Sequence, residues 1–148
     1  MNKLLIIFGI LFLSTATLAE RSYELGLGSS YGGIGVSVNS ELNSNTELFT
    51  GIGLDLDSVG YVVGSKFWLN DKSTLIASYG TNCIVWTGTT YHAYEGLNLG
   101  IGYSFTGKEA GWQFALFYAD ISECNKNESN VNGPGTDHGI DISIGYRF

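Results

Sequence analysis

Strict alternation between apolar residues and small or polar residues is the feature that most limits how this chain can fold. Across residues 96–105, for example, Leu, Ile, Tyr and Phe at the odd positions alternate with Gly, Asn and Ser at the even positions. Successive side chains of a strand point to opposite faces of a sheet, so a period of two predicts β-structure. Eight such segments follow one another, at about residues 23–28, 34–39, 47–56, 60–69, 74–80, 96–105, 112–119 and 140–148.

The two faces of these predicted strands differ in composition. One face is apolar, whereas the other is mainly Gly, Ser and Asn, and only 14% of all residues are charged, against about 25% in soluble domains. A soluble sandwich would instead give its outer face many Lys, Glu and Thr. Strands of about 9–11 residues cross a bilayer, and closure leaves no unpaired edge in hydrocarbon. The pattern therefore predicts an all-β fold, an eight-stranded antiparallel up-and-down transmembrane β-barrel with its apolar face toward lipid.

The first 19 residues have the features of a secretory signal peptide. Lys3 precedes a ten-residue, largely apolar run, Leu4–Leu13, and small residues follow up to Ala19. This order predicts export and cleavage before Glu20, because the apolar run is too short for a membrane-spanning helix. Residues 1–19 are thus predicted to be the signal peptide and residues 20–148 the barrel domain.

The predicted connections alternate in length, as in transmembrane barrels. Short turns are expected at 42–45, 70–72 and 106–111, and longer connections at 81–91 and 122–137. Short turns face the periplasm in such barrels and longer loops face outward. Two further external loops, near 29–33 and 57–58, are expected to be short. Aromatic residues of the apolar face gather at both predicted interfaces, with Phe67, Tyr103, Phe105, Trp112, Tyr146 and Phe148 at the periplasmic one and Tyr61, Tyr79 and Tyr118 at the other.

The stretch His138–Phe148 (HGIDISIGYRF) resembles the last strand of Gram-negative outer-membrane proteins. It has apolar residues at every second position, an aromatic residue at Tyr146 and a final Phe148. Residues 20–148 are similar in size and layout to the small OmpA/OmpX-type barrels. The resemblance implies an outer-membrane location and recognition of Tyr146 and Phe148 by the barrel-assembly machinery. It implies no activity, because fold does not determine function.

Several charged residues fall on the face predicted to line the lumen, namely Glu24, Glu47, Asp55, Lys66, Asp141 and Arg147. Buried charges require partners, and neighbouring strands would pair Arg147 with Glu24 and Lys66 with Glu47. The interior of an eight-stranded barrel is normally filled by side chains, and Phe49, Val62, Trp68, Ile76 and Phe117 also point inward. A plugged lumen is therefore expected, with a gate or a narrow leak as the alternative.

The two cysteines, Cys83 and Cys124, are expected in the third and fourth external loops, which would be neighbours. Exported proteins pass through an oxidising compartment, so a disulfide between them is predicted.

The sequence indicates no catalytic, metal or nucleic-acid site. The net charge of −7 and the scattered basic residues argue against a nucleic-acid partner. A hydrolase would need a nucleophile, a His base and an orienting carboxylate, and neither His92 nor His138 lies in a His-x-Ser pair. His92 with Glu95 is the pair to test for lipid A modification. Acidic residues near 120–123 and 137 could attract cations but are expected to be solvated, so no metal or cofactor is predicted.

These observations favour a monomeric outer-membrane barrel with a structural or surface-interaction role. Its expected partners are outer-membrane lipid, lipopolysaccharide and the assembly machinery. Three alternatives stay open: a narrow pore for small solutes, a lipid A-modifying enzyme, and a soluble periplasmic barrel that binds a small apolar ligand.

Overall fold

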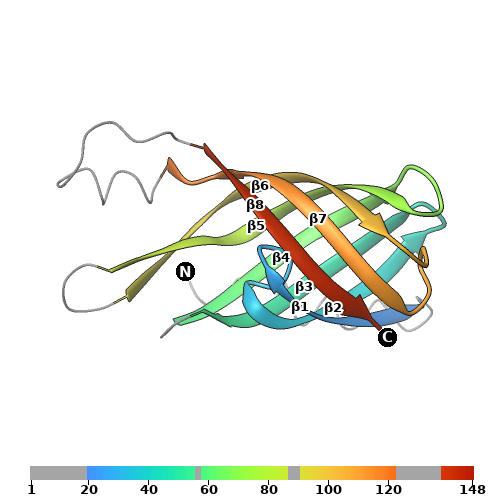
Figure 1. The fold of residues 1–148 in the computed structure, drawn as a ribbon, viewed down its shortest axis with the longest axis horizontal. Coiled ribbons are helices and arrows are strands. Elements are labelled where there is room, and N and C mark those ends of the chain that lie inside the picture. The colour runs from blue at the N-terminus through green and yellow to red at the C-terminus, as the bar shows by residue number, and fades with distance from the viewer. Residues whose placement is uncertain (1–19, 56–57, 87–90, 123–137) are drawn as a thin grey trace.

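In a computed structural model, the chain forms a closed barrel in which each strand pairs antiparallel with its neighbours in sequence, and β1 with β8 (Figure 1). The structure describes residues 20–55, 58–86, 91–122 and 138–148, and the side chains at 55, 58, 83–86, 91–93 and 138 lie outside this description. The strands are β1 (Arg21–Gly28), β2 (Gly33–Asn43), β3 (Thr46–Asp55), β4 (Ser58–Trp68), β5 (Ser73–Trp86), β6 (Tyr91–Ser104), β7 (Gly111–Asp120) and β8 (His138–Arg147). The predicted eight-stranded up-and-down barrel is confirmed.

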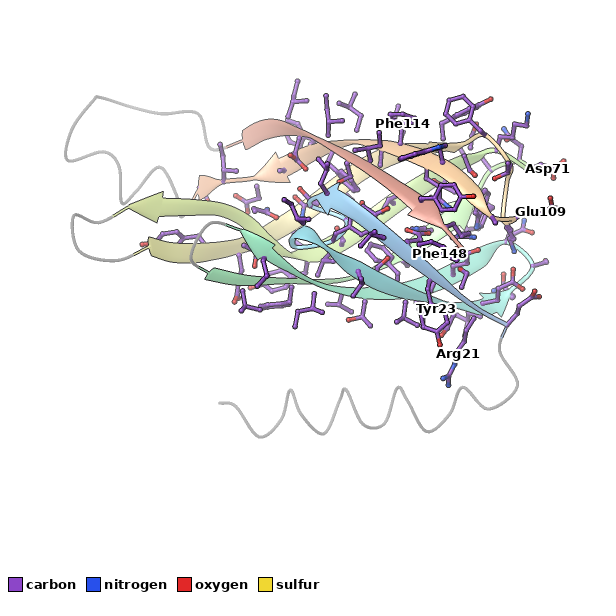
Figure 2. The ribbon with its side chains drawn as sticks, turned by 60° about the horizontal axis from the view of Figure 1, so that its bottom comes forward. Arg21, Tyr23, Asp71, Glu109, Phe114 and Phe148 are labelled. Carbon is purple, nitrogen blue, oxygen red and sulfur yellow. The ribbon has the colours of Figure 1, made fainter. Side chains whose placement is uncertain are left out.

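Alternation along each strand separates an apolar exterior from a polar interior. On β6, Leu97, Leu99 and Ile101 are 60–64% exposed, whereas the intervening Asn98 is 1% exposed. The same pattern recurs around the barrel, and Figure 2 shows side chains projecting outward along its length. The apolar face is thus the outside, as predicted, and the Gly-, Ser- and Asn-rich face lines the lumen.

The two ends of the barrel differ. At one end, here called the turn end, lie the connections 44–45, 69–72 and 105–110, and β1 begins and β8 ends there. Asn70 shapes one of these turns, because its side-chain oxygen accepts hydrogen bonds from the backbone N–H groups of Lys72 and Ser73, both at 2.9 Å. The opposite end, called the loop end, carries the connections after β1, β3, β5 and β7.

The predicted connection at 81–91 is wrong, because most of it is strand. β5 continues to Trp86 and β6 begins at Tyr91, and their backbones pair from Cys83–Tyr94 to Trp86–Tyr91. A bulge between Thr81 and Cys83 interrupts the regular register, which hides the alternation in the sequence. The β5–β6 hairpin therefore extends beyond the hairpins β1–β2 and β3–β4 at the loop end (Figure 1).

No helix within the described ranges is long and apolar enough to span a membrane.

Candidate functional site: the sealed interior of the barrel

Four charged side chains from four strands meet inside the barrel. Glu24 of β1, Glu47 of β3, Lys66 of β4 and Arg147 of β8 are each at most 4% exposed. Lys66 Nζ lies 2.7 Å from Glu24 Oε1, and Arg147 Nη2 lies 2.9 Å from the same oxygen. Arg147 Nη2 also lies 2.7 Å from Glu47 Oε2. We call these four side chains the charge network. It balances two carboxylates with two cations, which buried charges require.

Of the two ion pairs expected in the lumen, Arg147–Glu24 is present, whereas Lys66 pairs with Glu24 and not with Glu47. The backbones of Glu47 and Lys66 are directly opposite each other, but the Lys66 ammonium donates to Glu24. Arg147 occupies both oxygens of Glu47, with Nη1–Oε1 and Nη2–Oε2 distances of 3.1 and 2.7 Å. This bidentate arrangement is the geometry that a guanidinium favours, and it leaves Lys66 to reach across the lumen to Glu24.

The turn between β1 and β2 folds into the lumen at the loop end. The backbone N–H of Ser29 donates to Asp141 Oδ2 and that of Ser30 donates to Ser143 Oγ, both at 3.0 Å. Tyr31 is 2% exposed, and its hydroxyl donates to Glu24 Oε2 at 3.2 Å. We call residues 29–32 the inner turn. The short connection expected near 29–33 is present at this end of the barrel, but its expected external position is wrong, since the inner turn is buried.

Two glycines make room for the Tyr31 ring. A Cβ atom added at Gly145 of β8 would lie 1.9 Å from the Tyr31 hydroxyl oxygen, and one added at Gly26 of β1 would lie 2.4 Å from Cε2 of the ring. Gly26 and Gly145 are paired across the β1–β8 closure. Adjacent inward glycines on the first and last strands are the sequence signal from which an inserted ring could have been inferred.

A second connection covers the interior at the turn end. Lys108, between β6 and β7, reaches β2, where its ammonium pairs with Glu41 and donates to the Ser44 carbonyl oxygen at 2.7 Å. Arg147 Nη1 donates to the Lys108 carbonyl oxygen at 3.3 Å. The cations of Lys108 and Arg147 also lie 5.9 and 5.7 Å from the centre of the Trp68 ring, within range of cation–π attraction. The β6–β7 connection is thereby attached to the charge network.

Apolar side chains fill most of the remaining interior. Phe49, Val62, Ile76 and Phe117 form a buried cluster. Next to Tyr31, a cavity of about 20 Å³ remains, which is room for one water molecule. Trp68 and Gln113 line this cavity, and Trp68 Nε1 and Gln113 Nε2 are buried without a hydrogen-bond partner.

The other predicted residues have different outcomes. Cys124, and the side chains of Cys83, His92 and Asp55, lie outside the described residues, so the disulfide and the His92–Glu95 pair stay predictions. Glu95 faces outward and accepts a hydrogen bond from Tyr79 at 3.0 Å. The Tyr146 ring packs against Trp112 and Phe148, with centroids 5.5 and 5.4 Å apart. Within the part of the chain that the structure describes, no group of His, Cys, Asp and Glu could hold a metal ion.

In comparisons with known proteins, no family model, curated protein or solved structure matches this chain.

Proposed function

We propose that this protein is a bacterial outer-membrane β-barrel with a sealed lumen and a structural or surface-interaction role. The observation that carries the proposal is the apolar exterior of a closed barrel. Ile34, Leu97 and Ile140 are 64–78% exposed, and similar side chains surround the barrel. Water would hydrate such a surface at a high cost, whereas hydrocarbon would accommodate it. A closed barrel also satisfies its backbone internally, as spanning structures must.

Aromatic side chains at both ends of the apolar surface support this proposal. Near the turn end, Trp112 and Tyr146 face outward in contact, and Phe105 packs edge-on against Tyr103 and Phe114. Toward the loop end, Tyr79 and Tyr118 are 41% and 55% exposed. Two belts of aromatic side chains are typical of transmembrane barrels, because these rings prefer the interfacial depth. The turn end would then face the periplasm.

The sealed interior favours a structural or surface-interaction role over conduction. The inner turn, the charge network and the β6–β7 connection occupy the lumen in succession. Recognition would then fall to the loop end, where the segment 122–137 is polar and rich in Asn. The partners that this role requires are outer-membrane lipid and lipopolysaccharide around a monomeric barrel, and the assembly machinery that inserts it. Enzymatic activity is not part of the proposal.

Cell fractionation combined with heat-shift electrophoresis tests the membrane location. We expect the protein in the outer-membrane fraction of the expressing bacterium, with a gel mobility that changes on boiling because a closed barrel resists detergent. The amino terminus of the extracted protein is expected to be Glu20. Recovery in the soluble periplasmic fraction would instead favour a soluble barrel.

Planar-bilayer recording separates the sealed barrel from the narrow pore. We expect no unitary current steps from the purified, heat-modifiable protein at any polarity. Reproducible steps from protein of verified fold would show that the lumen conducts and would contradict the sealed role.

A further inference from the structure

A cavity of about 420 Å³ opens at the turn end of the barrel, beneath the charge network. Asn39 and Glu41 of β2, Arg147 of β8, and Lys108 and Glu109 of the β6–β7 connection contribute to its wall. Figure 2 shows Glu109 at this end of the molecule, with Asp71 of the neighbouring turn. The volume is within the range of small-molecule sites, roughly 300–1,000 Å³. We call this cavity the mouth.

Asn39 is the residue that marks the mouth as a binding site. It is 1% exposed, yet neither its Nδ2 nor its Oδ1 has a hydrogen-bond partner. Among the described Asn and Gln side chains, no other has both its amide nitrogen and its amide oxygen buried and unpaired. Buried polar groups are normally satisfied, and an exception requires an explanation such as a bound molecule. A donor and an acceptor side by side are complementary to another amide group.

Some charged groups around the mouth already have ion-pair partners, and others do not. Arg147 is engaged by Glu24 and Glu47, and Lys108 is engaged by Glu41. Glu20 and Glu109 also line the mouth and are exposed, and within the described part of the chain no ion pair involves either carboxylate. Arg21 lines the mouth as well and has an interaction of its own, and the proposed cleavage would place the amino-terminal ammonium on Glu20. The groups left to meet a ligand are therefore the Asn39 amide at the buried side and the Glu109 carboxylate at the open side.

From this arrangement we infer that the mouth binds a short peptide, or the end of a longer one, through an amide that pairs with Asn39 and an ammonium that faces Glu109. Lys108 is about one-third exposed and lines the mouth, where its ammonium is held by Glu41. The inference depends on the barrel fold and does not require the membrane location, so the two proposals fail independently.

The test is a titration of isotope-labelled, heat-modifiable protein in detergent micelles, followed by NMR of the Asn39 side-chain amide. Glycylglycine amide, which carries an ammonium and two amides, is expected to shift this resonance saturably. N-acetylglycine amide lacks the ammonium and is expected to bind more weakly. In Asn39→Leu, where binding is followed through the backbone amide resonances of Glu109 and Ala110 instead, the affinity for glycylglycine amide should fall about tenfold or more, as expected for the loss of paired hydrogen bonds.

Two further variants keep the result interpretable. Asn98→Leu removes another asparagine that is 1% exposed but lies outside the mouth, and it should leave binding unchanged. Glu109→Gln, at an exposed turn position, should weaken glycylglycine amide while leaving N-acetylglycine amide unaffected, even if Asn39→Leu does not fold. The inference is overturned if neither compound gives a saturable shift, or if the Asn39 amide shows cross-peaks to water alone, which would assign its partner as solvent.

Discussion

The hydroxyl of Tyr31 donates a hydrogen bond to Glu24 Oε2 over 3.2 Å, which joins the inner turn at the loop end directly to the charge network. Glu24 in turn accepts from Lys66, Arg147 and Ser37. One carboxylate therefore collects hydrogen bonds from β2, β4 and β8 and from the inner turn. Changes at Tyr31 and in the charge network should consequently affect the stability of the whole barrel.

Removing the Tyr31 ring should destabilise the barrel much more than removing its hydroxyl. We expect Tyr31→Ala to lower the free energy of unfolding by about 3–5 kcal/mol, because it leaves a cavity in a filled interior. Tyr31→Phe should cost about 1.5–3 kcal/mol, the value of one hydrogen bond to a charged group. Urea unfolding in micelles measures both, and equal losses would mean that the ring is not packed in the lumen.

A methyl group at Gly145 should conflict with Tyr31 specifically. Since the added Cβ would lie 1.9 Å from the Tyr31 hydroxyl oxygen, we expect Gly145→Ala to cost about 1–3 kcal/mol of unfolding free energy. In a Tyr31→Ala background the same change should cost clearly less, because the atoms in conflict are gone. Gly139→Ala, on the same strand, is the control, since its nearest neighbour is 3.2 Å away on the Ile121 side chain. Additive losses would show that Tyr31 lies elsewhere.

Double-mutant cycles should locate the partner of Lys66. We expect the coupling energy between Lys66→Met and Glu24→Gln to be about 1–3 kcal/mol, as for residues in direct contact. The coupling between Lys66→Met and Glu47→Gln should be smaller, because Arg147 occupies Glu47. A larger coupling of Lys66 to Glu47 than to Glu24 would instead support the Lys66–Glu47 pair that was expected from neighbouring strands.

Arg147 and Lys108 allow a buried cation to be compared with a partly exposed one. Arg147→Met leaves Glu47 buried without its cation, so it should cost about 3–5 kcal/mol of unfolding free energy. Lys108→Met breaks a pair in which both side chains are about one-third exposed, and it should cost under about 1 kcal/mol. Added salt should reduce the Lys108 effect and leave the Arg147 effect almost unchanged. A salt-sensitive Arg147 effect would contradict its burial.

The predicted Cys83–Cys124 bond has a direct readout. Gel mobility of the unboiled and boiled protein should change with reductant, because a closed loop of some 40 residues makes the denatured chain more compact. Cys124→Ser should have the mobility of the reduced protein under all conditions. No response to reductant in protein purified from an oxidising compartment would argue against the bond.

The alternation of apolar and polar residues was sufficient to predict the barrel, but it could not predict the contacts that side chains make across the lumen. The segment predicted at 47–56 is observed as Thr46–Asp55, because an apolar residue at every second position specifies one face of a strand. The bulge after Thr81 breaks that period, and residues 81–91, the outer part of the β5–β6 hairpin, were accordingly predicted to be a loop. Similarly, Ser29–Gly32 has the composition of a solvent-exposed turn, and its burial depends on glycines of β1 and β8 that closure brings beside it.

The partner of Lys66 illustrates the same limit. Strand order and register correctly place its backbone opposite Glu47. The position of the Lys66 ammonium, however, depends on Arg147. The Arg147 guanidinium donates both to Glu24 on β1 and to Glu47 on β3. Pairing between neighbouring strands is a local property, whereas competition for acceptors inside a closed lumen involves all strands together.

The seam between β1 and β8 is short, with four residue pairs from Glu24–Arg147 to Leu27–Ile144. Beyond Leu27, the inner turn continues the seam through the hydrogen bonds of Ser29 and Ser30 to side chains of β8. The Tyr31 ring, which lies inside the barrel, thus belongs to the same inner turn that continues the contact between β1 and β8. Filling the lumen and closing the cylinder therefore depend on the same short segment, residues 29–32, and neither is complete without it.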